Sequence, residues 1–315
     1  MLAEPGLMDF EDGMPAYVPP PPGYFAPPPP PREVIGLRPA TLADRPRVAE
    51  ICSQVFKGDD PLPQRFSGWV EDVDASFLVA EVDARLAAMH RLVPDGDAVT
   101  WYEGLRVAPE YRRRGLGRTM VEMGAASAQR RGSMEMRLHA GPECGAFFES
   151  VGFKPILQVA RWDADPKRRG HVPAVVTPEH TDVALGWLRQ DDAFNHYPGI
   201  KPVFGRSAAG DRRNVDRMAR EGTLRFTGAV PAFAAVRPTP DEPLRVTFLA
   251  GSGESMCDLL QGIRHQAHVE GTERVRVVAP ADHPCAAELE AAGYSIRDDF
   301  RLTVYSRPLV AGPHN

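Results

Sequence analysis

Two segments of the chain repeat one another, and this repeat constrains the fold more than any other feature. The segment EMRLHAGPECGAFFESVGF (135–153) aligns with RVRVVAPADHPCAAELEAAGY (274–294) at an offset of 141 residues. Five identities keep the same order in both copies: Ala140 with Ala281, Cys144 with Cys285, Ala146 with Ala287, Glu149 with Glu290, and Gly152 with Gly293. LRV at 105–107 also recurs at 244–246. An ordered series of this kind indicates duplication, so we expect two related domains in tandem.

Hydrophobic patterns predict alternating strands and helices in the first copy. Strands are expected over IGLRPA (35–40), SFLVAEV (76–82), RLAAMHRLV (85–93), WYEGLRV (101–107), MEMRLHA (134–140) and ILQVARW (156–162). Helices are expected over RPRVAEICSQVF (45–56), capped by Asp44, and over 115–131 and 144–153. ILQVARW is expected to close the sheet of this first unit. The predicted fold class is α/β (α+β) with a mixed sheet.

Composition divides the chain into five parts. The stretch VPPPPGYFAPPPPPR cannot form helix or sheet, because proline has no amide donor and a fixed φ. We interpret it as a solvated extended arm, with a ligand for a proline-binding module as the alternative. The predicted parts are a proline-rich disordered arm over 1–33, a catalytic domain over 34–165, a linker over 166–175, a second domain over 176–310 and a tail over 311–315.

The whole-chain charge argues against a protein that coats nucleic acid. Lys and Arg total 37 against 42 Asp and Glu, which gives a net charge of −5. No apolar run is long enough to cross a bilayer, and the N-terminus MLAEPGLMDFEDG is acidic where a signal peptide is basic and then apolar. The four cysteines lack CxxC spacing. We expect a cytoplasmic protein with reduced thiols, no metal, no nucleic-acid partner and no membrane partner.

The stretch RVAPEYRRRGLGRTM (106–120) places three arginines and two glycines between a predicted strand and a predicted helix. Amide groups in the first turn of a helix have no intrahelical acceptor, and the helix dipole adds positive potential there. Gly115 and Gly117 let the backbone approach a ligand closely. The sequence lacks the GKS/T of a Walker loop and the GxGxxG of a Rossmann loop. The pattern predicts a site for the phosphates of a compact anionic ligand, with a solvated turn as the alternative.

These residues resemble the GCN5-related N-acetyltransferase (GNAT) superfamily. Arg112, Gly115 and Gly117 fit its Q/R-x-x-G-x-G/A signature, and FFESVGF (147–153) is similar to its later Y-E-x-x-G-F element. The resemblance covers 34–165 well and reaches about 310 weakly. It implies two tandem acyl-CoA N-acyltransferase domains with acetyl-CoA as co-substrate, a primary amine on a small molecule or amino acid as acceptor, and direct attack without an acyl-enzyme.

The same resemblance implies roles for individual residues. The pyrophosphate of acetyl-CoA would lie on the loop amides, and the pantetheine arm would pair with the preceding strand. The Val107 amide would polarise the thioester carbonyl, and Glu103 is the candidate base, with a salt bridge to an arginine as its alternative role. The cofactor-binding set is Leu105, Arg106, Val107, Arg112, Arg113, Arg114, Gly115, Leu116, Gly117 and Arg118.

The sequence departs from the family pattern at the general acid. Phe148 stands where the family carries a tyrosine that protonates the leaving thiolate, and a phenyl ring has no proton to donate. Solvent, Tyr102, His139 and Cys144 are the open substitutes. This departure also keeps a rival function open, in which the protein is a non-catalytic acyl-CoA-binding sensor or regulator.

The second copy lacks the arginine-rich loop. After LRV the chain reads TFLAGSGESMCDLLQGIRHQA, with Glu254 at the expected helix start, where its charge repels phosphate. We therefore expect a degenerate GNAT-like domain, with a weaker CoA site at Gly251–Gly253 as the alternative. Asp191, Asp192, Asn195 and His196 are candidates to reach the acceptor, or an ordinary exposed loop. A covalent pseudo-dimer of this kind favours a monomer, with a homodimer as the alternative.

Overall fold

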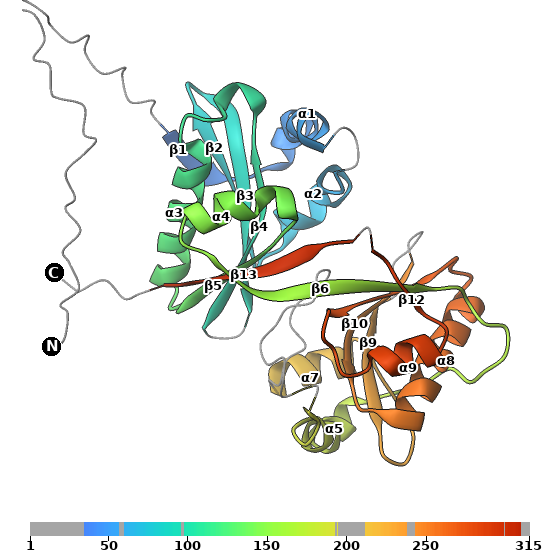
Figure 1. The fold of residues 1–315 in the computed structure, drawn as a ribbon. Coiled ribbons are helices and arrows are strands. Elements are labelled where there is room, and N and C mark those ends of the chain that lie inside the picture. Colours follow the sequence, from blue (N-terminus) through green and yellow to red (C-terminus); the bar gives the residue numbers. More distant parts are fainter. Residues whose placement is uncertain are drawn as a thin grey trace, which may run out of the picture. The chain divides into compact units, whose positions relative to one another are not determined.

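A mixed sheet runs through the part of the chain that the structure describes (Figure 1). The computed structural model describes residues 35–56, 60–95, 98–192, 194, 212–237, 243–298 and 300–309. Within them the strand order is β1-β2-β3-β4-β5-β13-β6-β11-β10-β9-β8-β7, with β12 pairing off this path to β6. We call residues 35–164 the first half and residues 165–309 the second half. The predicted arm, the predicted tail, Asn195 and His196 lie outside the described residues.

The first half follows the predicted alternation of strands and helices. Its elements are β1 (Ile35–Pro39), η1 (Leu42–Asp44), α1 (Arg45–Phe56), α2 (Leu62–Glu71), β2 (Ser76–Val82), β3 (Arg85–Asp95), β4 (Val99–Val107), η2 (Pro109–Tyr111), α3 (Leu116–Arg130), β5 (Glu135–Ala140), α4 (Pro142–Ser150) and β6 (Lys154–Ala164). The turn between β2 and β3 places Asp83 and Ala84 at positive φ, which matches the twist of a tight hairpin. The predicted strands and helices are confirmed here.

Two local predictions in the first half need correction. Helix α2 was not predicted, and its segment contains Pro61, Pro63 and Gly68, which are typical of loops. Proline is tolerated in a first helical turn, and the Asp60 carboxylate accepts a hydrogen bond from the Leu62 amide at 3.0 Å. Asp44 was predicted to cap α1; instead its carboxylate accepts a hydrogen bond from the Thr41 amide at 2.8 Å, within the capping box of η1.

The second half repeats the layout with different lengths. Its elements are β7 (Ala174–Val175), η3 (Pro178–His180), α5 (Thr181–Leu188), α7 (Arg212–Arg220), β8 (Leu224–Thr227), β9 (Ala232–Arg237), β10 (Leu244–Ala250), α8 (Gly253–Glu270), β11 (Val275–Pro280), α9 (Ala286–Ala291), β12 (Ser295–Ile296) and β13 (Leu302–Pro308). Its larger core cluster lies between the sheet and helices α8 and α9, around residues such as Leu259, Ile263 and Leu289.

The ends of α4 and α9 confirm the repeat at an offset of 141. The Phe153 amide donates to the Phe148 carbonyl at 3.1 Å, and the Tyr294 amide donates to the Leu289 carbonyl at 2.9 Å. The glycine before each of these aromatic residues has φ of +88° in the first copy and +83° in the second. Both helices therefore end in the same left-handed turn, which favours glycine.

The LRV recurrence does not reflect structural equivalence. In the first half LRV ends β4, whereas in the second half it begins β10. The pairing registers give the true match: Arg106 lies opposite Met89 on β3, and Ala250 lies opposite Phe233 on β9. Ala250 therefore corresponds to Arg106, and Gly251 to Val107. The same three residues therefore lie at the end of one strand and at the start of the other.

The closing strand of the first half is supplied by the far end of the chain. ILQVARW was expected to complete the first sheet, but β13 lies between β5 and β6 and pairs antiparallel with both. β6 in turn pairs with β11 of the second half. Val304 of β13 is fully buried with Val93, Trp101 and Val159. Strand character can be read from local sequence, but the choice of partner strand depends on long-range packing.

Candidate functional site

The two edges of β4 are paired to different extents. Along the β3 edge, antiparallel pairing runs over Val99–Val107. Along the β5 edge, parallel pairing covers only Val99–Trp101, opposite Glu135–Arg137. Among the described strands, the β5-facing edge of β4 therefore has no ladder partner over 102–107. Backbone donors and acceptors on such an edge are available to an extended ligand.

A β-bulge bends β4 within this unpaired stretch. Gly104 and Leu105 together lie opposite His90, because the register shifts between Met89 and Arg91 on β3. Gly104 has φ of +71°, and a Cβ there would lie 2.6 Å from the ring of Trp69. A bulge increases local twist and ends pairing, which accounts for the separation of β4 from β5. The glycine inside a predicted strand was the sequence signal for it, and it was missed.

The loop after β4 leaves the start of α3 open. Gly115 is the N-cap residue of α3, with φ of +85°, and Arg113 has φ of +59°. The Arg112 side chain donates to the Val107 carbonyl at 3.0 Å, which ties the loop to the end of β4. In the described part of the chain, no hydrogen bond reaches the first-turn amides of Leu116 and Gly117. They are the donors that an anion would meet.

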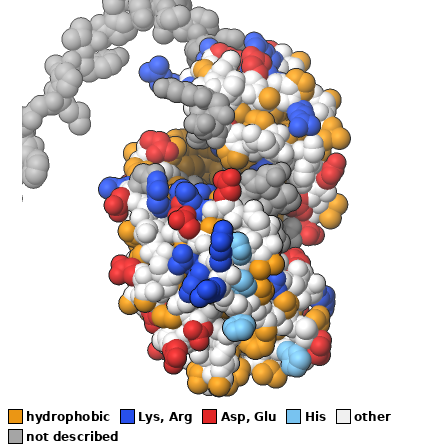
Figure 2. Space-filling model, turned by 90° about the vertical axis from the view of Figure 1, so that its right-hand side faces the viewer, with side chains coloured by type: hydrophobic (Ala, Val, Ile, Leu, Met, Phe, Trp, Pro, Cys, Tyr) orange, Lys and Arg blue, Asp and Glu red, His pale blue; other side chains and the backbone are white. Residues whose placement is uncertain are grey.

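Positive charge surrounds these amides. The exposed arginines of the site are Arg112, Arg113, Arg114 and Arg118. Gly117 lies against α4, since a Cβ there would be 3.4 Å from the Phe147 ring and 3.8 Å from Val107 Cγ2. On the face drawn in Figure 2, Lys and Arg side chains lie among Asp and Glu side chains. The positive charge at the start of α3 is local, since the whole chain has a net charge of −5, and it suits a compact anion.

The two remaining predicted side chains on β4 form ion pairs. Arg106 contacts the buried carboxylate of Asp60 at 2.7 Å. Burial opposes ionisation of Asp60, but the hydrogen bonds and charge of Arg106, together with hydrogen bonds from the Leu62 amide and Cys52, lower the pKa of that carboxyl. Glu103 accepts a hydrogen bond from Arg91 at 2.7 Å. The salt bridge left open as an alternative for Glu103 is therefore present.

Arg91 holds Glu103 in a polar cluster at one side of β4. The Arg91 guanidinium also pairs with Asp72 and lies 4.8 Å from the centre of the Trp69 ring. Arg91 and Trp69 were not singled out from the sequence. A basic residue on β3 and a tryptophan in a proline-bounded segment carry no motif, so only the fold brings them to Glu103.

Three side chains were considered as proton donors in place of the missing tyrosine: Tyr102, His139 and Cys144. Tyr102 is buried against His90, whose Nδ1 lies 3.3 Å from the Tyr102 hydroxyl. Burial raises the pKa of Tyr102 well above its ordinary value and lowers the pKa of His90 to about 4. His139 stacks on Trp101 with ring centres 4.7 Å apart. Burial also raises the pKa of the Cys144 thiol.

Phe148 lies in the core rather than at an exposed edge. It packs edge-on against Phe153, with ring centres 5.8 Å apart, and shares a buried cluster with Tyr305 of β13. A Cβ on Gly145 would lie 2.5 Å from the Tyr305 hydroxyl, so this hydroxyl lies directly against α4. Tyr305 is 163 positions beyond the start of α4, and nothing in the local sequence connects the two (305 − 142).

The corresponding amides in the second half already have acceptors. The Gly251 amide, the counterpart of Val107, donates to Asp191 Oδ2 at 2.7 Å. The Gly253 amide at the start of α8 donates to Glu288 Oε1 at 2.8 Å. Asp191 was a candidate to reach the acceptor substrate, but it lies on this backbone instead. Two carboxylates of the chain thus contact the backbone that is equivalent to Val107 and to the start of α3.

Comparison with known proteins identifies the first half. Residues 45–153 match the model of the acetyltransferase (GNAT) family. Over this segment the chain is similar to the GNAT family. The chain is 27% identical over 84 residues to a histidine N-acetyltransferase of Oreochromis niloticus. This aligned stretch covers 26% of this chain and 25% of that protein. A histidine N-acetyltransferase of Scomber australasicus is 26% identical over 83 residues. The match thus spans about a quarter of the length of each of these two relatives.

Solved structures extend the similarity to both halves. A GCN5-related N-acetyltransferase from Sphaerobacter thermophilus has a TM-score of 0.63 at 14% identity, covering 88% of this chain and 96% of that chain. A tandem GNAT protein from the clavulanic acid biosynthesis pathway has a TM-score of 0.54 at 17% identity, covering 90% and 100%. At these identities the likeness establishes the shared fold. The mixed α/β fold with two GNAT-like halves is therefore confirmed.

Two whole-chain features complete the description. Across the described ranges, no helix is both long and apolar enough to cross a membrane. In the same residues, no group of three His, Cys, Asp or Glu side chains is placed to hold a metal ion.

Proposed function

We propose that the first half transfers an acetyl group from acetyl-CoA to a primary amine. The observation that carries this proposal is the conjunction at the end of β4: an unpaired strand edge leads directly into an uncapped, arginine-flanked helix start. An acyl-CoA has the matching shape, with an extended amide-bearing arm joined to a pyrophosphate. The GNAT family match over the same residues supports this assignment.

In this proposal each part of the site holds one part of the coenzyme. The amides from Arg112 to Gly117 bind the pyrophosphate, and the arginines neutralise its charge. The backbone over Leu105–Val107 pairs with the pantetheine arm. The Val107 amide donates to the thioester oxygen, on which negative charge grows during attack.

The reaction breaks the thioester C–S bond as a C–N bond forms. The acceptor nitrogen attacks the carbonyl carbon, loses a proton, and the CoA thiolate leaves and takes up a proton. We propose Glu103 as the group that orients the amine and takes its proton, held in place by Arg91. The structure gives Phe148 no part in proton transfer, so the thiolate is protonated by another group or by water.

An amino acid is the acceptor class to examine first, with histidine as its leading member. This choice rests on the two fish histidine N-acetyltransferases, which share only about a quarter of their length with this chain. Small alkylamines form the comparison class. We further propose that the chain acts as a monomer, because its two related halves already share one sheet within a single chain.

A second function, acyl-CoA binding without turnover, is favoured by two observations. Phe148 removes the hydroxyl of the family's acid, and Glu103 is engaged by Arg91. Turnover separates the two functions, because a sensor binds acetyl-CoA but releases no CoA with any amine.

The experiment is a thiol-release assay with acetyl-CoA and a panel of amino acids and alkylamines. Release above the hydrolysis background with one acceptor class would support the transferase and identify its substrate. Glu103→Gln is expected to lower kcat by about 100-fold with little change in acetyl-CoA affinity. Binding of acetyl-CoA without release from any acceptor would instead establish the sensor.

A further inference from the structure

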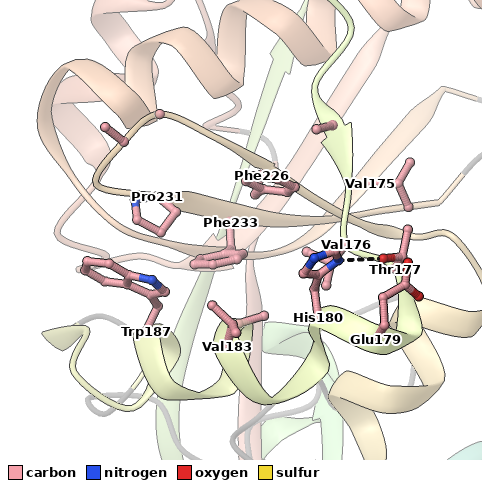
Figure 3. Close-up of a pocket in the computed structure, with 14 residues that line it drawn as sticks. Val175, Val176, Thr177, Glu179, His180, Val183, Trp187, Phe226, Pro231 and Phe233 are labelled. Atoms are coloured by element: carbon pink, nitrogen blue, oxygen red, sulfur yellow. Dashed lines mark hydrogen bonds between the residues drawn. The ribbon is translucent and has the colours of Figure 1, made fainter.

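The second half contains a cavity with no role in the proposed transfer. It has a volume of about 420 Å³ and lies between η3 and α5 on one side and the β8–β9 hairpin on the other (Figure 3). Its apolar walls include Val176, Val183, Trp187, Phe226, Pro231 and Phe233. Thr177, Glu179 and His180 form a polar end, on the opposite side of Phe233 from Trp187 in Figure 3.

The same position in the first half can be identified from hydrogen bonds. The Asp44 amide donates to the Thr41 carbonyl at 3.0 Å, and the His180 amide donates to the Thr177 carbonyl at 2.9 Å. Both pairs are related by an offset of 136 residues (177 − 41 and 180 − 44). One hydrogen bond after each first strand also matches. The Ala40 amide, after β1, donates to the Phe77 carbonyl of β2, and the Val176 amide, after β7, donates to the Leu224 carbonyl of β8, each at 2.9 Å.

In the first half this position is filled by charged side chains and a loop. Arg38 bridges the carboxylates of Asp44 and Glu81, each at 2.7 Å. Arg47 on α1 contacts Glu110 of η2 at 2.5 Å. Tyr111 of η2 packs on the cluster around Val48 and Leu86.

The second half replaces each of these groups. At the offset of 136, Arg38 corresponds to Ala174, Asp44 to His180, and Arg47 to Val183. Glu81 corresponds to Gly228, since β2 and β8 are related by an offset of 147 (224 − 77). The loop has no counterpart, because β10 ends at Ala250 and α8 begins at Gly253. Ion pairs and a loop thus occupy this position in the first half, whereas an apolar cavity lies there in the second half.

The polar end of the cavity carries a carboxylate. Thr177 Oγ lies 2.8 Å from His180 Nδ1. Hydrogen bonds from its own backbone and from Thr177 lower the pKa of Glu179, so its charge persists at neutral pH. A carboxylate beside aromatic and aliphatic walls attracts a cation attached to an apolar body.

We propose that this cavity binds a small primary amine with a flat apolar body. The apolar body would lie along Trp187 and Phe233, and the ammonium group would lie beside Glu179 and His180. This site is separate from the acetyl-CoA loop and does not depend on the proposed transfer. It gives the second half a binding function of its own.

The test follows Trp187 in the full chain by NMR. The chain has four tryptophans, and Trp187→Phe identifies which indole N–H signal belongs to Trp187. The probe is 2-phenylethylamine, and 3-phenylpropionate is its size-matched anionic control. We expect a saturable shift of the Trp187 signal with the amine, and Glu179→Gln to weaken it about fivefold. Binding to an acceptor site in the first half would not move this signal.

Position 183 provides the location control. Val183→Arg restores the charge found at Arg47 and is expected to weaken binding of the amine about tenfold. Val269→Arg is its match, since Val269 is a similarly exposed valine on α8. No saturable Trp187 shift, equal affinity for the carboxylate, or unchanged binding in Val183→Arg would each overturn the proposal. Folding of the variants is checked by the remaining indole signals.

Discussion

The starts of α3 and α8 show how one duplicated element reached two opposite electrostatic states. At α3 the first-turn amides meet no acceptor among the described residues, and four exposed arginines lie around them. At α8 the equivalent backbone is covered by the carboxylates of Asp191 and Glu288. The fold supplies an anion site at both places. In our proposal, a few side chains and the length of one loop decide which half accepts a phosphate.

The equivalent positions on β3 and β9 differ in whether they hold a titratable group. His90 is fully buried, and its pKa of about 4 lies below the ordinary value of 6.5. A lowered folded-state pKa gives stability that is present above pH 6.5 and lost as pH falls towards 4. Ala234 is the counterpart of His90 on β9, and it is also fully buried. Its methyl side chain cannot take up a proton.

We therefore predict a loss of about 3 kcal/mol in the free energy of unfolding between pH 6.5 and 4 from this one residue. Urea denaturation at several pH values measures it. His90→Gln should flatten the profile, whereas His268→Gln, at an exposed position, should leave it unchanged. Equal profiles for all three proteins would show that His90 does not carry the difference.

The second prediction concerns charge at the start of α3. Arg113→Glu with Arg114→Glu should weaken acetyl-CoA binding by about 100-fold, because two favourable phosphate contacts become repulsive. Calorimetry measures the affinity. Arg130→Glu with Arg131→Glu makes the same charge change at the other end of α3, and it should alter affinity only slightly. A similar loss in both double variants would indicate a general charge effect rather than a site.

The third prediction removes the internal carboxylates of the second half. Asp191→Ala and Glu288→Ala should each lower the free energy of unfolding by about 1–2 kcal/mol, because a backbone amide loses its acceptor. Asp192→Ala and Glu290→Ala are the exposed neighbouring controls. If Asp191→Ala and Glu288→Ala are as stable as their controls, the amides at α8 do not depend on these side chains.

The smallest predicted effect compares the two helix ends. Gly152→Ala and Gly293→Ala should each cost about 1 kcal/mol, since both glycines have positive φ. Gly293→Ala should cost more, because its Cβ would lie 2.4 Å from Arg264 Nη1 and displace a side chain that donates to the Ala292 carbonyl. Thermal denaturation of the two variants measures the difference. A larger cost at Gly152 would contradict this comparison.

Most features encoded in consecutive residues could be predicted from the sequence, apart from α2 and the bulge at Gly104, and features made by distant residues could not. The order of the strands along the chain as far as α3, and the helix ends at glycine, follow from local patterns. The placement of β13, the ion pair of Glu103 with Arg91, and the match of Thr41 with Thr177 depend on pairing between segments. The LRV identity shows the converse, because a short match in sequence occurred at two different registers.

The most direct test of the account is the stoichiometry of acetyl-CoA binding to the intact chain, measured by calorimetry. The account predicts one equivalent per chain, lost in the Arg113→Glu, Arg114→Glu double variant. Two equivalents, or one that survives in that variant, would contradict it and place a coenzyme site outside the start of α3.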